Sequence, residues 1–486
     1  MITFKDISFS YPERDTAGLR NINLKIKKGE CILLCGRSGC GKTTITRLIN
    51  NLIPYFYEGD LDGTVIVDKM CSQSTAMYSI SEKVGSVFQN PRTQFFNVDT
   101  DSEIAFGIEN EALPQEKLKE RVDKTINDLK LQSLRGRNIF QLSGGEKQKI
   151  AFASVYAMNP DIYLLDEPSS NLDMDSINDL KKYLKFIKDQ GKTIIIAEHR
   201  LYYLLDLADK IIYLKDGKID NIYNSDTFRL IPNKLRKEMG LRSVELKDVH
   251  PVRNNFKVDK PVLEINNVTL KHDKRTILKN ISVSVGKGEV IAVVGSNGAG
   301  KTTFSRTLCG LHKEYTGEFL YKGKVCKNKE RLKHCYMVMQ DVNYELFAES
   351  VEAEMSFGIK NPDKDLIEKT MDELGILPYR KCHPNTLSGG QKQRIAVGVS
   401  MISGKEILVF DEPTSGLDYD SMIQVSRLIN ELSEKGKIIF IVTHDYEFVC
   451  STCSRVIHFD EGTLKDNLVV TKENEDKLCK IFSIGN

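Results

Sequence analysis

Two short stretches of this chain place glycine, lysine and threonine at a spacing that binds phosphate. The first reads LLCGRSGCGKTT at 33–44, and the second reads VVGSNGAGKTT at 293–303. In each, the glycines let successive backbone N–H groups turn toward an anion, and the helix that follows adds its partial positive charge. We therefore expect Lys42 and Lys301 to reach the outer phosphates of a nucleotide.

An aspartate that ends an apolar run accompanies each phosphate cradle. Asp166 closes the run YLLD, and Asp411 closes the run LVFD. A threonine hydroxyl and a carboxylate that acts through water are oxygen ligands that suit Mg²⁺. The sequence therefore predicts a Mg²⁺ ion held by Thr43 and Asp166 in the first copy and by Thr302 and Asp411 in the second.

The residue after each aspartate is a glutamate, followed by proline. A carboxylate at this place, Glu167 or Glu412, can orient or polarise the water that attacks a phosphate. Gln89 in VFQNP and Gln340 in VMQDV would complete the surroundings of the metal ion and the water. Glutamines after strands are common, so the prediction for these two depends on the other motifs.

A histidine ends a later apolar run in both copies. His199 follows Asp166 by 33 residues, and His444 follows Asp411 by the same number. A lone histidine in such a place usually has a structural role. The equal spacing instead favours a histidine that senses the outermost phosphate.

These motifs form an internal repeat, which decides the domain organisation. LSGGEKQKI and LSGGQKQRI are a further repeated motif, called the signature below. The distance from signature to histidine is the same in both copies, while the distance from cradle to signature differs. Insertions are therefore tolerated between cradle and signature but not in the catalytic part. The matched pairs are Lys42 and Lys301 at an offset of 259, and Ser143 and Ser388, Asp166 and Asp411, and His199 and His444 at an offset of 245.

Strands and helices that could position these residues alternate along the chain. The runs DIYLLDEP, KTIIIAEH, EILVFDEP and KIIFIVTH are short, apolar and β-branched, which is typical of strands buried on both faces of a parallel sheet. The stretches PQEKLKERVDKTINDLKL and DLIEKTMDELGI have the apolar period of helices. The pattern predicts an α/β fold with domains at 1–223 and 259–486 and a linker at 224–258.

The overall composition is that of a globular protein that stays in the cytoplasm. The 69 Lys and Arg nearly balance the 67 Asp and Glu, so we expect no nucleic acid partner. The apolar runs are too short to span a membrane, and the start does not resemble a signal peptide. The 11 cysteines suit reduced thiols, and the pair Cys450 and Cys453 lacks the second pair that a zinc site would need. Cys40 lies inside the first cradle, where oxidation could block a nucleotide, but the pattern favours a small residue that fills a permissive position in the loop.

The sequences LSGGEKQKI and LSGGQKQRI resemble the signature of ATP-binding cassette ATPases. With the other motifs, the resemblance covers nearly the whole chain twice. It implies two tandem P-loop domains, each with a mixed β subdomain, a RecA-like parallel-sheet core and a helical subdomain, and it implies ATP and Mg²⁺ as cofactors. The residues that it places on the nucleotide are Tyr11, Gly36, Arg37, Ser38, Gly39, Cys40, Gly41, Lys42, Thr43, Thr44, Ser143, Gly144, Gly145, Gly295, Ser296, Asn297, Gly298, Ala299, Gly300, Lys301, Thr302, Thr303, Ser388, Gly389 and Gly390.

The same resemblance implies ATP sites that are shared between two domains. In this family, the signature of one domain contacts the γ-phosphate that the other domain holds. One site would join the cradle at 36–44 to the signature at 388–390, and the other would join the cradle at 295–303 to the signature at 143–145. A tandem chain can thus complete both sites by folding head-to-tail on itself.

The two copies also differ at positions that matter in this family. Tyr11 occupies the place of an aromatic residue that stacks on adenine, but its counterpart is His272. After the second histidine comes Asp445, as the family usually has, whereas Arg200 follows the first. We therefore expect two competent sites with unequal affinity for nucleotide.

The segments that follow the two glutamines resemble those of a particular group of transport ATPases. QNPRTQFFNVDTDSEIAFGIEN and QDVNYELFAESVEAEMSFGIKN are similar to the ATPases of energy-coupling factor importers, which take up vitamins, cobalt and nickel. This resemblance implies a peripheral protein on the cytoplasmic face of the membrane. It would dock on integral membrane subunits, one of which selects the substrate. Phe95, Phe96, Tyr344 and Phe347 would anchor the docking, with a place in the core as the alternative for some of them.

Two other classes of protein share the twin-cassette organisation. A soluble translation factor that acts on ribosomes would also lack membrane spans, but such proteins carry a long, charged helical linker. The fused ATPase of a sugar importer usually has one degenerate cassette, whereas both glutamates are present here. Each remains an alternative to the importer function.

Overall fold

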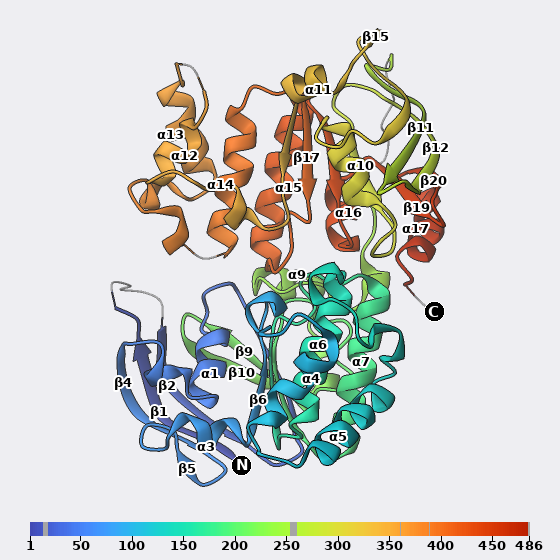
Figure 1. Ribbon diagram of the computed structural model, residues 1–486. Coiled ribbons are helices and arrows are strands. Elements are labelled where there is room, and N and C mark those ends of the chain that lie inside the picture. Colours follow the sequence, from blue (N-terminus) through green and yellow to red (C-terminus); the bar gives the residue numbers. More distant parts are fainter. Residues whose placement is uncertain (13–17, 253–259, 360, 388, 485–486) are drawn as a thin grey trace. The chain divides into compact units, whose positions relative to one another are not determined.

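The structure is a computed structural model that describes two compact units of the chain (Figure 1). The first comprises Met1–Val244 and Asp418–Asp420, and the second comprises Glu245–Leu417 and Ser421–Asn486. Both are α/β units with the same order of strands, which confirms the predicted fold class. The residues that the structure describes are 1–12, 18–252, 260–359, 361–387 and 389–484.

A small antiparallel sheet opens the first unit. Its strand order is β2-β1-β4-β5, and every pairing is antiparallel. Along β1, side chains such as Ile2, Phe4, Ile7 and Phe9 are buried, so this sheet presents one apolar face to the rest of the unit. The strands are β1 (Ile2–Ser10), β2 (Gly18–Ile26), β4 (Asp60–Val67) and β5 (Met70–Cys71).

A six-stranded sheet forms the centre of the first unit. Its order is β10-β9-β3-β8-β7-β6, and only the edge strand β10 runs antiparallel to its neighbour. The strands are β10 (Lys218–Tyr223), β9 (Lys210–Lys215), β3 (Cys31–Gly36), β8 (Thr193–Ala197), β7 (Ile162–Asp166) and β6 (Val84–Val87). Because β3, β7 and β8 lie side by side and run parallel, the residues after their carboxyl ends meet at one edge of the sheet.

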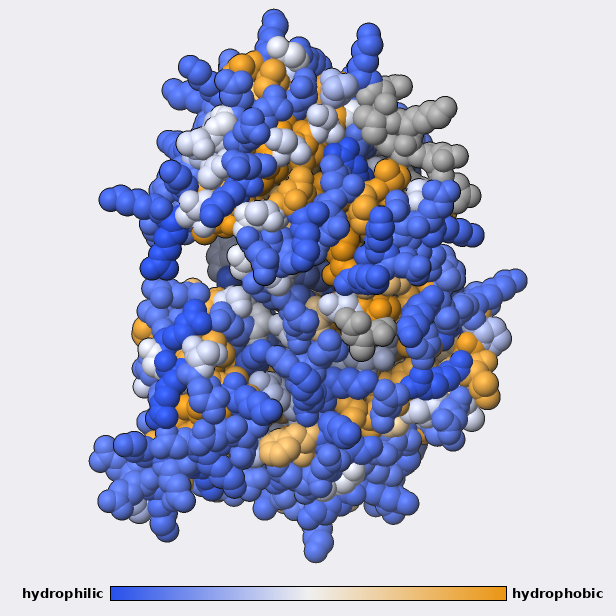
Figure 2. Space-filling view, turned by 90° about the vertical axis from the view of Figure 1, so that its right-hand side faces the viewer, coloured by the Kyte–Doolittle hydropathy of each residue, from blue (hydrophilic) through white to orange (hydrophobic). Residues whose placement is uncertain are grey.

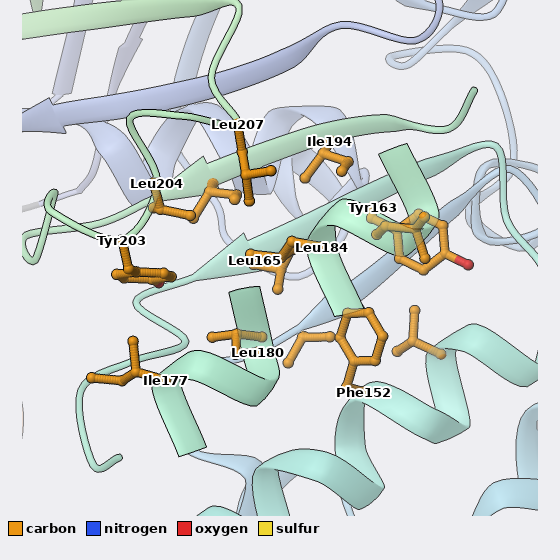
Figure 3. Packing of buried hydrophobic residues seen from close by; sticks show 14 of the residues in the cluster. Phe152, Tyr163, Leu165, Ile177, Leu180, Leu184, Ile194, Tyr203, Leu204 and Leu207 are labelled. Atoms are coloured by element: carbon orange, nitrogen blue, oxygen red, sulfur yellow. The ribbon is translucent and has the colours of Figure 1, made fainter. Parts of the chain in front are cut away.

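Helices cover this sheet and extend to one side of it. Figure 3 shows Phe152 of α6 and Leu184 of α7 facing Tyr163 and Leu165 of β7 in the core between sheet and helices. In Figure 1, α4 and α5 lie on the opposite side of the unit from β1 and β2, as a helical subdomain should. The helices are α1 (Lys42–Ile49), α2 (Leu52–Tyr55), α3 (Met77–Ser81), α4 (Thr100–Glu109), α5 (Gln115–Asp128), α6 (Gly144–Ala157), α7 (Met174–Asp189), α8 (Ser225–Arg229) and α9 (Asn233–Glu238).

The first unit continues past residue 223, where the sequence predicts a linker to begin. The helices α8 and α9 fold onto the first unit, and Phe228, Met239 and Val244 are buried in its core. The hydroxyl of Tyr213 also donates a hydrogen bond of 3.0 Å to the carbonyl of Met239. Although the stretch after residue 223 is mostly polar, a few apolar side chains anchor it to the first unit. The boundary of that unit therefore lies at Val244.

The second unit repeats both sheets. The small sheet has the order β12-β11-β14-β15, and the large sheet has the order β16-β17-β18-β13-β19-β20, which is the order of the first unit read from its other edge. The strands are β11 (Leu263–His272), β12 (Arg275–Val285), β13 (Val290–Val294), β14 (Tyr315–Tyr321), β15 (Lys324–Val325), β16 (Cys335–Val338), β17 (Ile407–Asp411), β18 (Ile438–Val442), β19 (Arg455–Asp460) and β20 (Thr463–Val469).

The helices of the second unit also follow the first, with α12 and α13 on the opposite side of the unit from β11 and β12 (Figure 1). Among the described residues, no helix has the length and apolar character that crossing a bilayer requires. The face in Figure 2 is mostly hydrophilic, with hydrophobic residues in small groups. The helices are α10 (Lys301–Leu308), α11 (Asn328–His334), α12 (Val351–Ser356), α13 (Lys364–Glu373), α14 (Gly389–Ile402), α15 (Tyr419–Glu434), α16 (Tyr446–Thr452) and α17 (Glu475–Ile481).

Candidate nucleotide sites

Each phosphate cradle is the turn that joins a buried central strand to a helix. In the first unit, β3 ends at Gly36 and α1 begins at Lys42. Gly36 has a φ of 144°, and a β-carbon there would collide with the carbonyl oxygen of Leu214. Gly295 has a φ of 150° and the same conflict with Phe459. Only glycine fits these positions, which explains why both stretches begin with it.

The two cradle lysines are buried in their own loops. The ammonium of Lys42 donates to the carbonyls of Gly36 and Arg37, at 3.1 Å in both cases. The ammonium of Lys301 donates to the carbonyls of Gly295 and Ser296, at 2.7 and 3.0 Å. Each positive charge therefore lies against backbone carbonyls of its own cradle, and contact with a phosphate stays a prediction.

A hydroxyl and a buried carboxylate meet beside each cradle. Thr43 Oγ1 donates to Asp166 Oδ1 at 3.2 Å, and Thr302 Oγ1 lies 3.5 Å from Asp411 Oδ2. Burial raises the pKa of Asp166 to about 6, and the neighbouring charge of Glu167 adds to the effect. Burial likewise raises the pKa of Asp411 to about 6. A buried carboxylate that is costly to ionise, next to a second oxygen ligand, fits a divalent cation such as Mg²⁺.

The glutamate after each aspartate has an unusual backbone conformation. Glu167 has a φ of 45° and Glu412 a φ of 51°, in the left-handed region that few residues other than glycine adopt. Their N–H groups donate to the carbonyls of Ala197 and Val442, at 2.8 Å each. The backbone of each glutamate thus still pairs with the neighbouring strand, although its φ is not that of a strand residue. Such strain is concentrated at functional sites.

The glutamine and histidine predicted from sequence converge on the glutamate in the first unit. Gln89 Nε2 donates to Glu167 Oε2 at 2.7 Å, and His199 Nε2 lies 3.4 Å from Glu167 Oε1. In the second unit, His444 Nε2 lies 3.7 Å from Glu412 Oε1. Gln340 follows the end of β16 by two residues, just as Gln89 follows the end of β6. Residues far apart in the sequence therefore meet at the carboxyl edge of each parallel sheet.

The signature residues begin a long helix in each unit. Ser143 caps α6 in a capping box, in which its hydroxyl accepts from the N–H of Glu146 and its own N–H donates to the carboxylate of Glu146. The helix α14 begins at Gly389, which is the counterpart of Gly144. Ser388 lies outside the described residues.

The two residues predicted to contact adenine have different surroundings. The hydroxyl of Tyr11 lies 3.2 Å from Thr44 Oγ1 and accepts from Arg47 Nη1 at 3.0 Å, so its ring is tied to the cradle helix. Strand register confirms the alignment with His272, because β1 and β11 begin at equivalent positions, Ile2 and Leu263. The imidazole of His272 is exposed at the end of β11.

The segments after the glutamines contain residues that sequence reasoning missed. Phe106 and Phe357 are exposed and lie 251 residues apart, which is also the offset between Gln89 and Gln340. Phe96 stacks on Phe106 with ring centroids 4.6 Å apart. The repeated FGI motif was the available signal. Phe95, in contrast, packs against the core of the first unit, so it takes the alternative place foreseen for some of these aromatics.

Both units therefore have the fold and the site of a P-loop nucleoside triphosphatase. The ABC transporter family model matches residues 19–170 and 278–415. A putative ABC transporter ATP-binding protein of Treponema denticola is 50% identical over 481 residues, which cover 98% of either chain. A putative ABC transporter ATP-binding protein of Clostridium perfringens is 30% identical, over 95% of this chain and 89% of the other.

A solved structure of similar fold covers nearly the whole chain. It is described as a model of ribosome-bound archaeal Pelota and ABCE1, and the likeness has a TM-score of 0.70 at 20% identity, over 98% of this chain and 80% of the other. At this identity it shows the fold alone. The family match and the relatives show that the chain belongs to the ABC transporter family. It is an ATPase with two ATP-binding domains.

Proposed function

We propose that this chain hydrolyses ATP to energise a membrane importer of the energy-coupling factor type. It would lie at the cytoplasmic face of the membrane and dock on integral membrane subunits, which select and carry a vitamin or a transition metal. The observation that carries the proposal is a pair of exposed aromatic side chains in the segment after the catalytic glutamine of each unit. The pairs are Phe96 and Phe106 in the first unit and Phe347 and Phe357 in the second.

The catalytic part of the proposal assigns a role to each residue at the sheet edge. Thr43 and Asp166, with Gln89, would hold Mg²⁺, which supplies positive charge to the phosphates. Glu167 accepts a hydrogen bond from the attacking water and orients it. His199, packed against the same carboxylate, would sense the γ-phosphate. The corresponding residues of the second unit are Thr302, Asp411, Gln340, Glu412 and His444.

The nucleotide itself would be held by both units of the chain. The cradle at 36–44 would bind phosphates together with the signature at 388–390, and the cradle at 295–303 together with the signature at 143–145. This head-to-tail pairing rests on the resemblance of the signatures to those of other cassettes. Tyr11 would stack on adenine in the first site, with His272 as a weaker substitute in the second.

The aromatic pairs would contact apolar segments of a membrane subunit. Phe96 is 72% exposed and Phe347 is 71% exposed, although each is a large apolar side chain. Phe106 and Phe357 accompany them at the same offset. Exposed aromatics that recur at equivalent places indicate binding sites, since buried aromatic anchors dominate the energetics of most interfaces.

The backbone next to these aromatics is held rigidly. Glu103 is 1% exposed, and its carboxylate accepts from the N–H groups of Phe96 and Asn97 at 3.0 and 2.8 Å. Glu354 does the same for Phe347 and Ala348, at 2.7 Å each. Because the glutamine lies only seven residues before the phenylalanine, movement of a docked segment would be transmitted to the catalytic glutamine.

The experiment is affinity purification of the whole tagged chain from its own cells in mild detergent, followed by mass spectrometry. We expect polytopic membrane proteins to co-purify with the wild type and to be lost with the double variant Phe96→Asp/Phe347→Asp. A buried charge without a partner is costly, so aspartate at these two places opposes an apolar contact. The melting temperature should stay unchanged, because both side chains are exposed.

The matched control is Leu230→Asp, which places the same charge at a leucine that is 80% exposed and lies outside the glutamine segment. This control should keep its membrane partners. Recovery of ribosomal proteins instead of membrane proteins would favour a translation factor and contradict the proposal. Unchanged recovery of membrane proteins by the double variant would remove the aromatic pairs from the interface.

A further inference from the structure

The residues on either side of His199 differ in charge from those on either side of His444. The first unit has Glu198, His199 and Arg200, whereas the second has Thr443 and Asp445 around its histidine. Glu198 is 2% exposed and Arg200 is 7% exposed. Two opposite charges buried beside a catalytic residue need a physical reason, because desolvation of each is costly.

The carboxylate of Glu198 joins two loops of the site. Its Oε1 accepts from the N–H groups of His199 and Arg200, at 2.7 and 3.1 Å. Its Oε2 accepts from the N–H of Ser169 at 3.3 Å and from the hydroxyl of Tyr203 at 2.9 Å. Four donors on one carboxylate offset much of the cost of burying it.

The guanidinium of Arg200 binds the same loop from its other side. Its Nη1 donates to the carbonyls of Ser169 and Leu172, at 3.2 and 3.3 Å. Ser169 is therefore held at its N–H by Glu198 and at its carbonyl by Arg200. Because Ser169 lies two residues after Glu167, this clamp fixes the loop that carries the catalytic glutamate against the loop that carries the histidine.

In the second unit, the carboxylate of Asp445 joins the two loops. Asp445 Oδ2 accepts from the hydroxyl of Thr414 at 2.9 Å, and the N–H of Asp445 donates to Thr443 Oγ1 at 3.1 Å. Asp445 Oδ1 accepts from the N–H of Phe448 at 3.1 Å. Thr414 lies 245 residues after Ser169, so the same pair of loops is connected through other atoms.

We propose that Glu198 and Arg200 are positioning residues of the first ATP site, where they do together what Thr443 and Asp445 do in the second. This inference rests on the proposed roles of Glu167 and His199. It explains why Arg200 can replace the usual acidic residue: a glutamate two positions earlier supplies the carboxylate. The clamp sets the distance of 3.4 Å between His199 Nε2 and Glu167 Oε1.

The test exchanges the two networks within the full chain. Arg200→Asp alone places a second carboxylate beside Glu198 and should at least halve the kcat for ATP, because one of two sites is damaged. The KM should change little, since the cradle is untouched. The four-residue transplant Ser169→Thr/Glu198→Thr/Arg200→Asp/Tyr203→Phe installs the second unit's network and should restore kcat.

Two further variants make the result decisive. Lys182→Asp reverses the charge of an exposed lysine and should leave kcat unchanged. The reciprocal transplant Thr414→Ser/Thr443→Glu/Asp445→Arg/Phe448→Tyr installs the clamp in the second unit and should retain activity. It keeps the test informative even if Arg200→Asp fails to fold.

The proposal is overturned by normal kcat in a folded Arg200→Asp chain. It is also overturned if both transplants fold and bind ATP but turn over no faster than Arg200→Asp. That outcome would show that the two networks are not interchangeable devices for positioning the histidine.

Discussion

Replacement of Glu345 by glutamine should stabilise the second unit, and the gain should grow as the pH rises toward neutral. Glu345 Oε1 accepts from the N–H of Met339 at 2.6 Å, but Oε2 is buried and has no hydrogen-bond partner within the described structure. The first unit has Gln94 in this place. Its amide accepts from the N–H of Phe88 and donates to the carbonyl of Ser86, both at 3.3 Å. An ionised glutamate has no hydrogen to donate to the equivalent carbonyl.

The size and sign of the effect follow from the pKa of Glu345. Burial raises this pKa from 4.5 to about 7, and the charges of Asp411 and Glu354 add to the effect. Between these pH values the unfolded chain releases the proton while the folded chain keeps it, so the free energy of unfolding falls as the pH rises. This difference in pKa lowers the free energy of unfolding by at most about 3 kcal/mol, and the full loss is reached above pH 7. Glutamine removes this cost.

Hydrogen exchange of the full, nucleotide-free chain in EDTA can measure the gain, because it reports on the second unit separately from the first. We expect Glu345→Gln to increase protection of the second unit strongly at pH 8 and little at pH 5. The matched control, Gln94→Glu, should lower protection of the first unit strongly at pH 8 and little at pH 5. An equal effect of Glu345→Gln at both pH values, or none at pH 8, would refute the reasoning.

Two further predictions concern the cradles. Tyr11→Ala should weaken ATP binding by about fivefold, because roughly 1 kcal/mol of aromatic contact is lost. His272→Ala should change the affinity little. Equal losses for the two variants in equilibrium titrations would contradict the asymmetry of the two sites. Cys40 is buried, and burial raises its pKa, so its thiol should react with iodoacetamide more slowly than that of the half-buried Cys71. Peptide mass spectrometry measures both rates, and faster modification of Cys40 would contradict the structure.

Much of the fold could be predicted from the sequence because the repeat marks the same elements twice. Apolar runs such as those before Asp166 and Asp411 are short, β-branched and followed by polar residues, which identifies buried parallel strands without any alignment. The cradle motifs then fix the order of strand and helix. The convergence of Gln89, His199 and Glu167 follows from that topology, since parallel strands end at one edge.

The remaining features depend on packing that the local sequence does not reveal. The stretch after residue 223 has few apolar residues, yet Phe228 and Met239 suffice to bury it against the first unit. Of two adjacent phenylalanines, Phe95 packs against the core and Phe96 is exposed to solvent. The second copy has the buried Leu346 at the position equivalent to Phe95. Comparison of the two copies could therefore have shown which phenylalanine is buried and which is exposed.

The difference at Arg200 shows a third limit. The sequence shows that Arg200 departs from the family pattern. It does not show that Glu198 supplies the missing carboxylate, because that role follows only from its four hydrogen bonds. A substitution that looks damaging in one position can thus be part of an exchanged network.

The most direct test of the whole account is the rate of ATP hydrolysis by the purified chain with both catalytic glutamates changed. If Glu167 and Glu412 orient the attacking water, each single change to glutamine should lower kcat severely. The double variant Glu167→Gln/Glu412→Gln should lose about a hundredfold or more while it still binds ATP. Near-normal turnover by the folded double variant would contradict the assignment of both sites.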